Sequence, residues 1–128
     1  MKSILLADDE ESLRMLIHAT LDDPGYLIVE ASDGDEALAM ARAHRPDLIV
    51  LDWMMPGKTG VEVTALLRAE EATSHTPIIL LTAKSQQQDI DAALETGVTS
   101  YVVKPFSPID LLEKVEKLLA GRLEPANV

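Results

Sequence analysis

The chain has 128 residues, of which 47% are hydrophobic and 26% charged, as expected for one folded globular domain. The formal net charge of −11 disfavours binding to the phosphate backbone of DNA or RNA, and the absence of cysteine excludes disulfides and thiolate chemistry. Apolar runs such as 48–51 are far shorter than the roughly 20 residues that span a bilayer, and the N-terminus is unlike a signal peptide. We therefore expect a cytoplasmic protein.

Short apolar runs alternate with segments of helical periodicity from the N-terminus onward. Ser3–Ala7 is a continuous apolar run, which predicts a strand buried on both faces. After the acids at 8–11 comes a helical pattern that Pro24 and Gly25 end. Its apolar face holds Leu13, Leu16, Ile17, Thr20 and Leu21. The next predicted elements are a strand at Leu27–Ala31, a helix capped by Ser32 or Asp33 with a stripe of Ala37, Leu38, Met40 and Ala41, a strand at Leu48–Leu51 ending at Asp52, a loop at Trp53–Gly60, and a helix at Val61–Ala69.

The same alternation continues through the second half of the chain. Pro77 opens a predicted strand at Ile78–Leu81. The helix that follows is capped by Ser85 and closed by Gly97, and its inward-facing residues are Ile90, Ala93 and Leu94. A short strand at Tyr101–Val103 comes next, and the last helix starts at Pro108 and stops at Gly121. The stripe of the last helix is Leu111, Leu112, Val115, Leu118 and Leu119. We expect one domain over residues 1–121 and a C-terminal tail at 122–128.

Strict alternation of strands and helices predicts one α/β domain with a parallel sheet covered by helices on both faces. Ligand sites in such sheets lie beyond the carboxyl ends of the strands, near the point where the strand order reverses. The polar residues at those ends are Asp8 and Asp9, Asp52, Thr82 and Lys104. We expect these side chains, which are far apart in sequence, to meet at one edge of the sheet.

The predicted cluster has a chemistry of its own. Two carboxylates about 4 Å apart repel each other by roughly 4 kcal/mol at an effective dielectric constant near 20. A bound divalent cation is the simplest way to offset this repulsion. Mg²⁺ suits a site with one or two carboxylates, water and a phosphoryl group. Lys104 supplies a point charge for a phosphoryl oxygen, and Thr82 supplies a hydroxyl donor. With Asp52 at the centre, the cluster has the parts for phosphoryl transfer onto a carboxylate.

The order and spacing of several motifs resemble the receiver domain of two-component response regulators, over about residues 2–120. The matching motifs are Ile4-Leu5-Leu6-Ala7-Asp8-Asp9-Glu10, Pro46-Asp47-Leu48-Ile49-Val50-Leu51-Asp52 with Met55-Pro56-Gly57 and Gly60, Pro77-Ile78-Ile79-Leu80-Leu81-Thr82-Ala83, Gly97, and Tyr101-Val102-Val103-Lys104-Pro105-Phe106. The resemblance implies a doubly wound, flavodoxin-like fold, with five parallel strands in the order 2-1-3-4-5 and five helices.

The resemblance also implies a role for each residue at the strand ends. Asp52 would accept a phosphoryl group from a phosphohistidine kinase or a phosphotransfer protein. Asp9 and Asp52 would bind Mg²⁺ through their side chains, Asp8 mostly through water, and Met54 through its backbone carbonyl. Lys104 would pair with the phosphoryl group.

A switch and a tuning role follow from the same resemblance. Thr82 would move toward the phosphoryl group on activation and Tyr101 would swing inward behind it, which reshapes the face formed by the fourth helix, fifth strand and fifth helix. Met54 and Lys84 occupy two variable positions that would tune the access of hydrolytic water, and the charge of Lys84 favours a long-lived phospho-form. The Lys104-Pro105 bond is commonly cis in the family.

The resulting hypothesis is a phosphorylation-activated signalling switch that is not an enzyme, since it catalyses only its own phosphorylation and dephosphorylation. Its downstream target is a protein, and the chain would be a monomer or a phosphorylation-dependent dimer. A small phosphatase is the enzyme alternative, but such enzymes usually carry a second Asp two positions after the nucleophile, where this chain has Met54. The third reading is a receiver-like module that binds partners without phosphorylation. Such modules typically lack one of the acids or the lysine.

Overall fold

The structure is a computed structural model that describes residues 1–84 and 86–123, with side chains up to residue 120. The elements, in chain order, are β1 (Lys2–Ala7), α1 (Glu11–Leu21), β2 (Tyr26–Ala31), α2 (Gly34–His44), β3 (Leu48–Asp52), α3 (Gly60–Arg68), the short 3₁₀ helix η1 (Glu71–Thr73), β4 (Ile78–Thr82), α4 (Gln87–Thr96), β5 (Ser100–Val103) and α5 (Pro108–Leu123).

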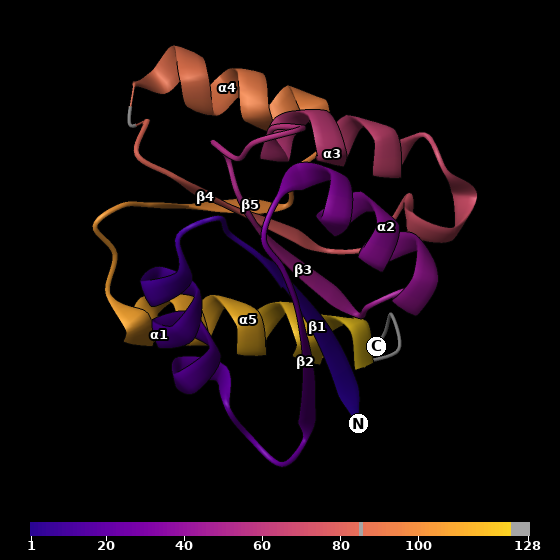
Figure 1. Cartoon of the computed structure of the whole chain (residues 1–128), viewed down its shortest axis with the longest axis vertical. Coiled ribbons are helices and arrows are strands. Elements are labelled where there is room, and N and C mark those ends of the chain that lie inside the picture. The colour runs from indigo at the N-terminus through magenta and orange to yellow at the C-terminus, as the bar shows by residue number, and fades with distance from the viewer. Residues whose placement is uncertain (85, 124–128) are drawn as a thin grey trace.

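Within these residues, five parallel strands form one sheet in the order β2-β1-β3-β4-β5. Helices α1 and α5 cover one face of the sheet, and α2, α3 and α4 cover the other (Figure 1). The predicted doubly wound α/β fold and its strand order are therefore confirmed. The order reverses between β1 and β3, which is where sheets of this kind hold their ligand sites.

The core is divided by the sheet into two apolar clusters. In β3 every residue is buried, and successive side chains point to opposite faces. Ile49 and Leu51 pack with α2, α3 and α4, whereas Leu48 and Val50 pack with α1 and α5. Burial on both faces explains why the central strands are continuous apolar runs rather than alternating patterns.

Capping residues explain where several helices begin or end. Asp33 caps α2, because its side chain accepts a hydrogen bond from the backbone N–H of Glu36 at 2.7 Å. Thr59 and Glu62 form a reciprocal capping box at the start of α3. Gly97 ends α4 with φ +115°, in the left-handed region that favours glycine. Ser85, the predicted cap of α4, lies outside the described residues, and the prediction is wrong because α4 begins at Gln87 with Gln86 at the cap position.

Two other predictions about helices were wrong, and one short helix was not predicted. Helix α5 continues past Gly121 to Leu123, since a single glycine within a helix costs only about 1 kcal/mol and does not by itself end it. Leu94 is 42% exposed, while Ile90 and Ala93 are buried as expected. The 3₁₀ helix η1 was not predicted. Residues 124–128 of the predicted tail lie outside the described residues, so the domain boundary at 121 stays a prediction.

Two further properties of the chain correspond to the predictions made from its sequence. The Lys104-Pro105 peptide bond, which follows β5, is cis, as the resemblance implies. Across the described residues, the helices are too short or too polar to cross a bilayer.

Candidate functional site

The predicted site residues lie at the carboxyl edge of the sheet, because the strands are parallel. Asp8 and Asp9 follow β1, Asp52 is the last residue of β3, Thr82 is the last residue of β4, and Lys104 follows β5. The β1–β3 register pairs Ala7 with Leu51, so the next residues along the two strands, Asp8 and Asp52, are neighbours. The strand register thus brings together residues more than 40 positions apart in sequence.

Three carboxyl groups converge at this edge. One carboxylate oxygen from each of Asp8, Asp9 and Asp52 lies within 4.8 Å of the other two. Asp8 and Asp52 are buried, whereas Asp9 is exposed. The Lys104 ammonium lies 3.0 Å from Asp52 Oδ1 and 3.8 Å from Asp8 Oδ2. In the described part of the chain, Lys104 is the cation that pairs with these acids, so fully ionised acids carry an uncompensated negative charge.

Asp8 is the least satisfied of the three acids. Its Oδ1 accepts a hydrogen bond from the backbone N–H of Glu10 at 2.8 Å, but its buried Oδ2 has no hydrogen-bond partner among the described residues. Burial raises the pKa of Asp8 from 3.8 to about 6, the Glu10 N–H opposes this shift, and the Asp52 charge adds to it. Burial also raises the pKa of Asp52, against the lowering effect of the Lys104 hydrogen bond.

These observations test whether a divalent cation fits the cluster. The donor set consists of carboxylate oxygens, which Mg²⁺ prefers, and the buried Oδ2 of Asp8 is an acceptor without a donor. A cation at this edge would offset the repulsion between buried acids that Lys104 balances only in part. The residues present therefore fit Mg²⁺.

Thr82 and Tyr101 lie near the cluster without joining it. The buried Thr82 hydroxyl oxygen accepts a hydrogen bond from the Lys84 backbone N–H at 2.8 Å, within the turn that follows β4. Tyr101 is half-buried on β5, paired in register with Leu80, and packs against the core on the α2–α3–α4 face. The predicted switch residues thus lie on the adjacent strands β4 and β5.

The two predicted tuning residues are both exposed. Met54 is 61% exposed in the loop that follows Asp52. The Lys84 ammonium lies 5.2 Å from the centroid of the Trp53 ring, a cation–π distance. Trp53 directly follows Asp52, so this contact places the Lys84 ammonium over the loop next to Asp52.

Sequence reasoning missed Arg14, which supports the site from α1. One guanidinium nitrogen donates to the Asp8 backbone carbonyl at 2.6 Å, and Nε donates to Glu30 on β2 at 2.8 Å. His18, which showed no ligand spacing, also contacts Glu30. Burial raises the pKa of Glu30, but the bonds from His18 and Arg14 outweigh burial and lower it. An arginine within an ordinary helical pattern gives no sequence signal for such a contact.

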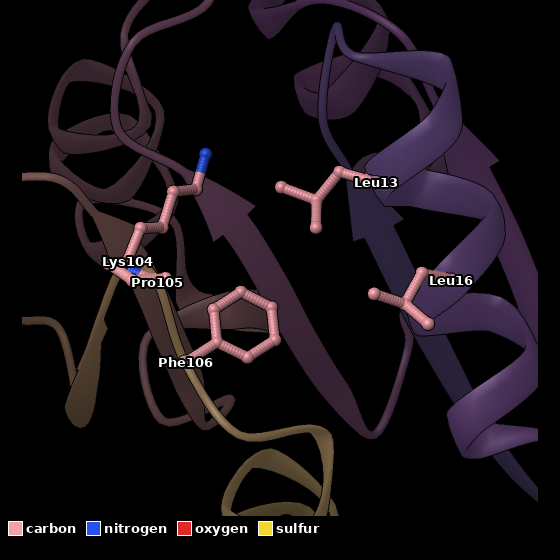
Figure 2. A pocket seen from close by; sticks show the side chains of 5 residues that line it. All are labelled: Leu13, Leu16, Lys104, Pro105 and Phe106. Carbon is pink, nitrogen blue, oxygen red and sulfur yellow. The ribbon is translucent and has the colours of Figure 1, made fainter.

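A groove of about 270 Å³ borders the site on the side of Lys104. Its walls come from α1 and from the segment after β5, and are formed by Leu13, Leu16, Lys104, Pro105 and Phe106. Figure 2 shows the Phe106 ring facing the two leucines across the groove. Leu16 is 49% exposed, so the predicted apolar stripe of α1 faces the groove as well as the core.

Comparison with known proteins gives matches over nearly the whole chain. The family model for the response regulator receiver domain matches residues 4–116. The phosphate regulon transcriptional regulatory protein PhoB of Pseudomonas aeruginosa is 41% identical over 92% of this chain, which covers 52% of that regulator. The chain thus spans about half the length of such relatives. The chemotaxis protein CheY of the same organism is 40% identical, over 90% of this chain and 94% of CheY.

A solved structure adds an observation about metal. The receiver domain of the sensor histidine kinase PA1611 of P. aeruginosa has a TM-score of 0.84 and 32% identity, and the match covers 93% of this chain and 98% of that one. That receiver domain holds a magnesium ion coordinated in its active-site cleft.

Proposed function

Because the chain belongs to the receiver-domain family of two-component response regulators, we propose that it is a signalling switch operated by phosphorylation of Asp52. One observation carries this proposal. Asp52 lies 3.0 Å from the Lys104 ammonium, inside a cluster of three acids whose negative charge this one ammonium does not balance. Such a cluster suits the reversible binding of a cation and a phosphoryl group better than it suits the stability of the fold.

The transfer joins the Asp52 carboxylate to the phosphorus atom of a phosphohistidine. A carboxylate oxygen attacks phosphorus, the O–P bond forms, and the P–N bond breaks and leaves its electron pair on the imidazole, which takes up a proton. The product is an acyl phosphate on Asp52. The Lys104 ammonium, already on the Asp52 carboxylate, stabilises the negative charge of the transferred group.

Mg²⁺ would be held by the side chains of Asp9 and Asp52, by Asp8 through water, and by the Met54 backbone carbonyl. The orphaned Asp8 oxygen and the oxygen-only donor set support this assignment. When bound, the cation neutralises charge on the phosphoryl oxygens and the acids. The magnesium in the cleft of the PA1611 receiver domain, a relative at 32% identity, supports the same assignment.

The conformational change on phosphorylation would begin at Thr82 and continue at Tyr101. Thr82 would exchange its bond with the Lys84 N–H for one to the phosphoryl group, which draws the turn after β4 toward Asp52. Tyr101, beside Leu80 on the neighbouring strand, would follow into the space behind it. The consequence is a changed surface over α4, β5 and α5. Phosphorylation shifts the population between two arrangements of this surface.

The phosphodonor would be a histidine kinase or a phosphotransfer protein, and the groove of Figure 2 is the surface on which it would lie. The groove is apolar along Leu13, Leu16 and Phe106 and ends at Lys104, whose ammonium contacts Asp52. A donor that covers the groove would bring its phosphohistidine to the acceptor and exclude water. The cytoplasmic setting stays a prediction.

The test is incubation with acetyl phosphate and Mg²⁺, followed by intact mass measurement. We expect a gain of one phosphoryl group in the wild type and none in Asp52→Asn. Asp22→Asn, which removes the same charge at an exposed position, should be phosphorylated like the wild type. A wild type that stays unmodified, or an Asp52→Asn protein that gains the group, would overturn the proposal.

A further inference from the structure

The start of α2 holds the loop that follows Asp52. This loop, residues 53–59, connects β3 to α3. The backbone N–H of Gly34, the first residue of α2, donates to the Pro56 carbonyl at 3.0 Å. The next residue, Asp35, pairs with Lys58 at 2.6 Å. A backbone contact and an ion pair thus fix the second half of the loop to α2.

Gly34 permits an approach that no other residue allows. It is buried, and a Cβ atom there would lie 1.9 Å from the Lys58 carbonyl oxygen and within 2.7 Å of the Lys58 carbonyl carbon and nitrogen. These are backbone atoms, which cannot rotate away as a flexible side chain can. A side chain at position 34 therefore requires residues 56–58 and the start of α2 to move apart. Gly34 is helical, so alanine would meet no backbone strain of its own.

The first half of the loop is fixed by other elements. The Trp53 N–H donates to the Leu81 carbonyl of β4 at 2.8 Å, and the Trp53 carbonyl accepts from the Gly60 N–H of α3 at 2.8 Å. Met54 and the buried Met55 lie between this anchor and the one on α2. If residues 56–58 move while Trp53 stays, the displacement must be taken up by the peptide units of Met54 and Met55.

We infer that Gly34 and the Asp35–Lys58 pair are positioning residues for the metal site: they hold the Met54 carbonyl in place and thereby set the affinity for Mg²⁺. This inference rests on the proposed function, which assigns that carbonyl to the cation. It adds a control point on α2, a helix that contributes no side chain to the acid cluster.

The experiment is a Mg²⁺ titration followed by the fluorescence of Trp53, the single tryptophan, which directly follows Asp52. All proteins are titrated well below their unfolding temperatures. We expect Gly34→Ala to raise the Kd for Mg²⁺ about tenfold or more. Gly25→Ala is the matched control, since a Cβ there would meet only an Asp23 side-chain oxygen at 3.2 Å. Its Kd should stay within about twofold of the wild type.

A second readout separates positioning from general loss of structure. At saturating Mg²⁺ the rate of phosphorylation by acetyl phosphate in Gly34→Ala should return toward the wild-type rate, while the Mg²⁺ concentration for half-maximal rate stays high. A protein damaged throughout would not recover in this way.

Asp35→Asn provides a test that does not depend on the folding of Gly34→Ala. It removes only an exposed ion pair, and we expect a Kd about two- to fivefold above that of the charge control Asp22→Asn. If the wild type binds Mg²⁺ but Gly34→Ala and Asp35→Asn keep Kd values within the range of their controls, the inference is wrong. If the wild type itself shows no saturable Mg²⁺ binding, the proposed function fails instead.

Discussion

Replacing Asp8 by asparagine should stabilise the protein when no metal is bound. The Asp8 carboxyl is fully buried, one of its oxygens has no hydrogen-bond partner among the described residues, and its pKa is raised from 3.8 to about 6. At about 1.4 kcal/mol per pKa unit, a shift of roughly two units limits the cost of ionised Asp8 to about 3 kcal/mol. Asparagine keeps an acceptor for the Glu10 N–H and removes the charge. We therefore expect the free energy of unfolding to rise by about 1–3 kcal/mol at neutral pH.

The pH dependence of this difference has a definite sign. A carboxyl whose pKa is higher in the folded state than in the unfolded state holds its proton more tightly when folded. Its stabilising contribution is therefore fully present below the unfolded value, near 3.8, and is lost as the pH rises through about 6. The advantage of Asp8→Asn over the wild type should be small at the acidic end of this range and full above it.

Urea unfolding in EDTA, at several pH values, measures this difference directly. Excess Mg²⁺ should reverse the order, because a ligand at 100 times its Kd adds about 2.7 kcal/mol to the protein that binds it. Asp8→Asn should gain less from Mg²⁺ than the wild type. An Asp8→Asn protein no more stable than the wild type in EDTA at neutral pH would refute the interpretation of Asp8 as an uncompensated buried acid.

Three other changes test separate parts of the molecule. Lys84→Ala should shorten the lifetime of the acyl phosphate on Asp52 about two- to tenfold, measured by decay after removal of the donor. Equal lifetimes in the two proteins would contradict a role of Lys84 in tuning the hydrolysis. Leu16→Glu should slow transfer from a phosphohistidine protein about tenfold or more but leave phosphorylation by acetyl phosphate unchanged, and a loss with both donors would contradict a docking role. Leu51→Ala should lower the free energy of unfolding by about 2–5 kcal/mol in urea, whereas the half-exposed Leu94→Ala should cost less than about 1 kcal/mol.

The strands and the place of the site were predictable because both depend on burial. A stretch covered on both faces must be apolar throughout, so β1, β3 and β4 contain the uninterrupted apolar runs 4–7, 48–51 and 78–81. The first polar residue after such a run marks its carboxyl end, where Asp8 and Asp52 lie. Parallel pairing then brings these ends together without any knowledge of side-chain contacts. The strand order itself came from family resemblance, since periodicity does not encode it.

Contacts between elements were not predictable from the sequence pattern. Helical periodicity fixes the angle at which a side chain leaves its helix, but it does not show which neighbour covers it. Leu16 fits the apolar stripe of α1, yet it faces a groove that the segment after β5 covers only in part. Arg14 and Gly34 act on backbone atoms of Asp8 and Lys58, and nothing in their local sequence marks those partners.

The order in which the sheet contributes its side chains sets when the site can first exist. Asp8 comes from the first strand and Lys104 follows the last, so the ammonium that balances Asp52 leaves the ribosome almost a hundred residues after the first acid. A nascent chain that has emerged only as far as β4 holds the acids but not their lysine. The cluster that we propose as the phosphorylation site is therefore complete only after nearly all of the domain has been synthesised.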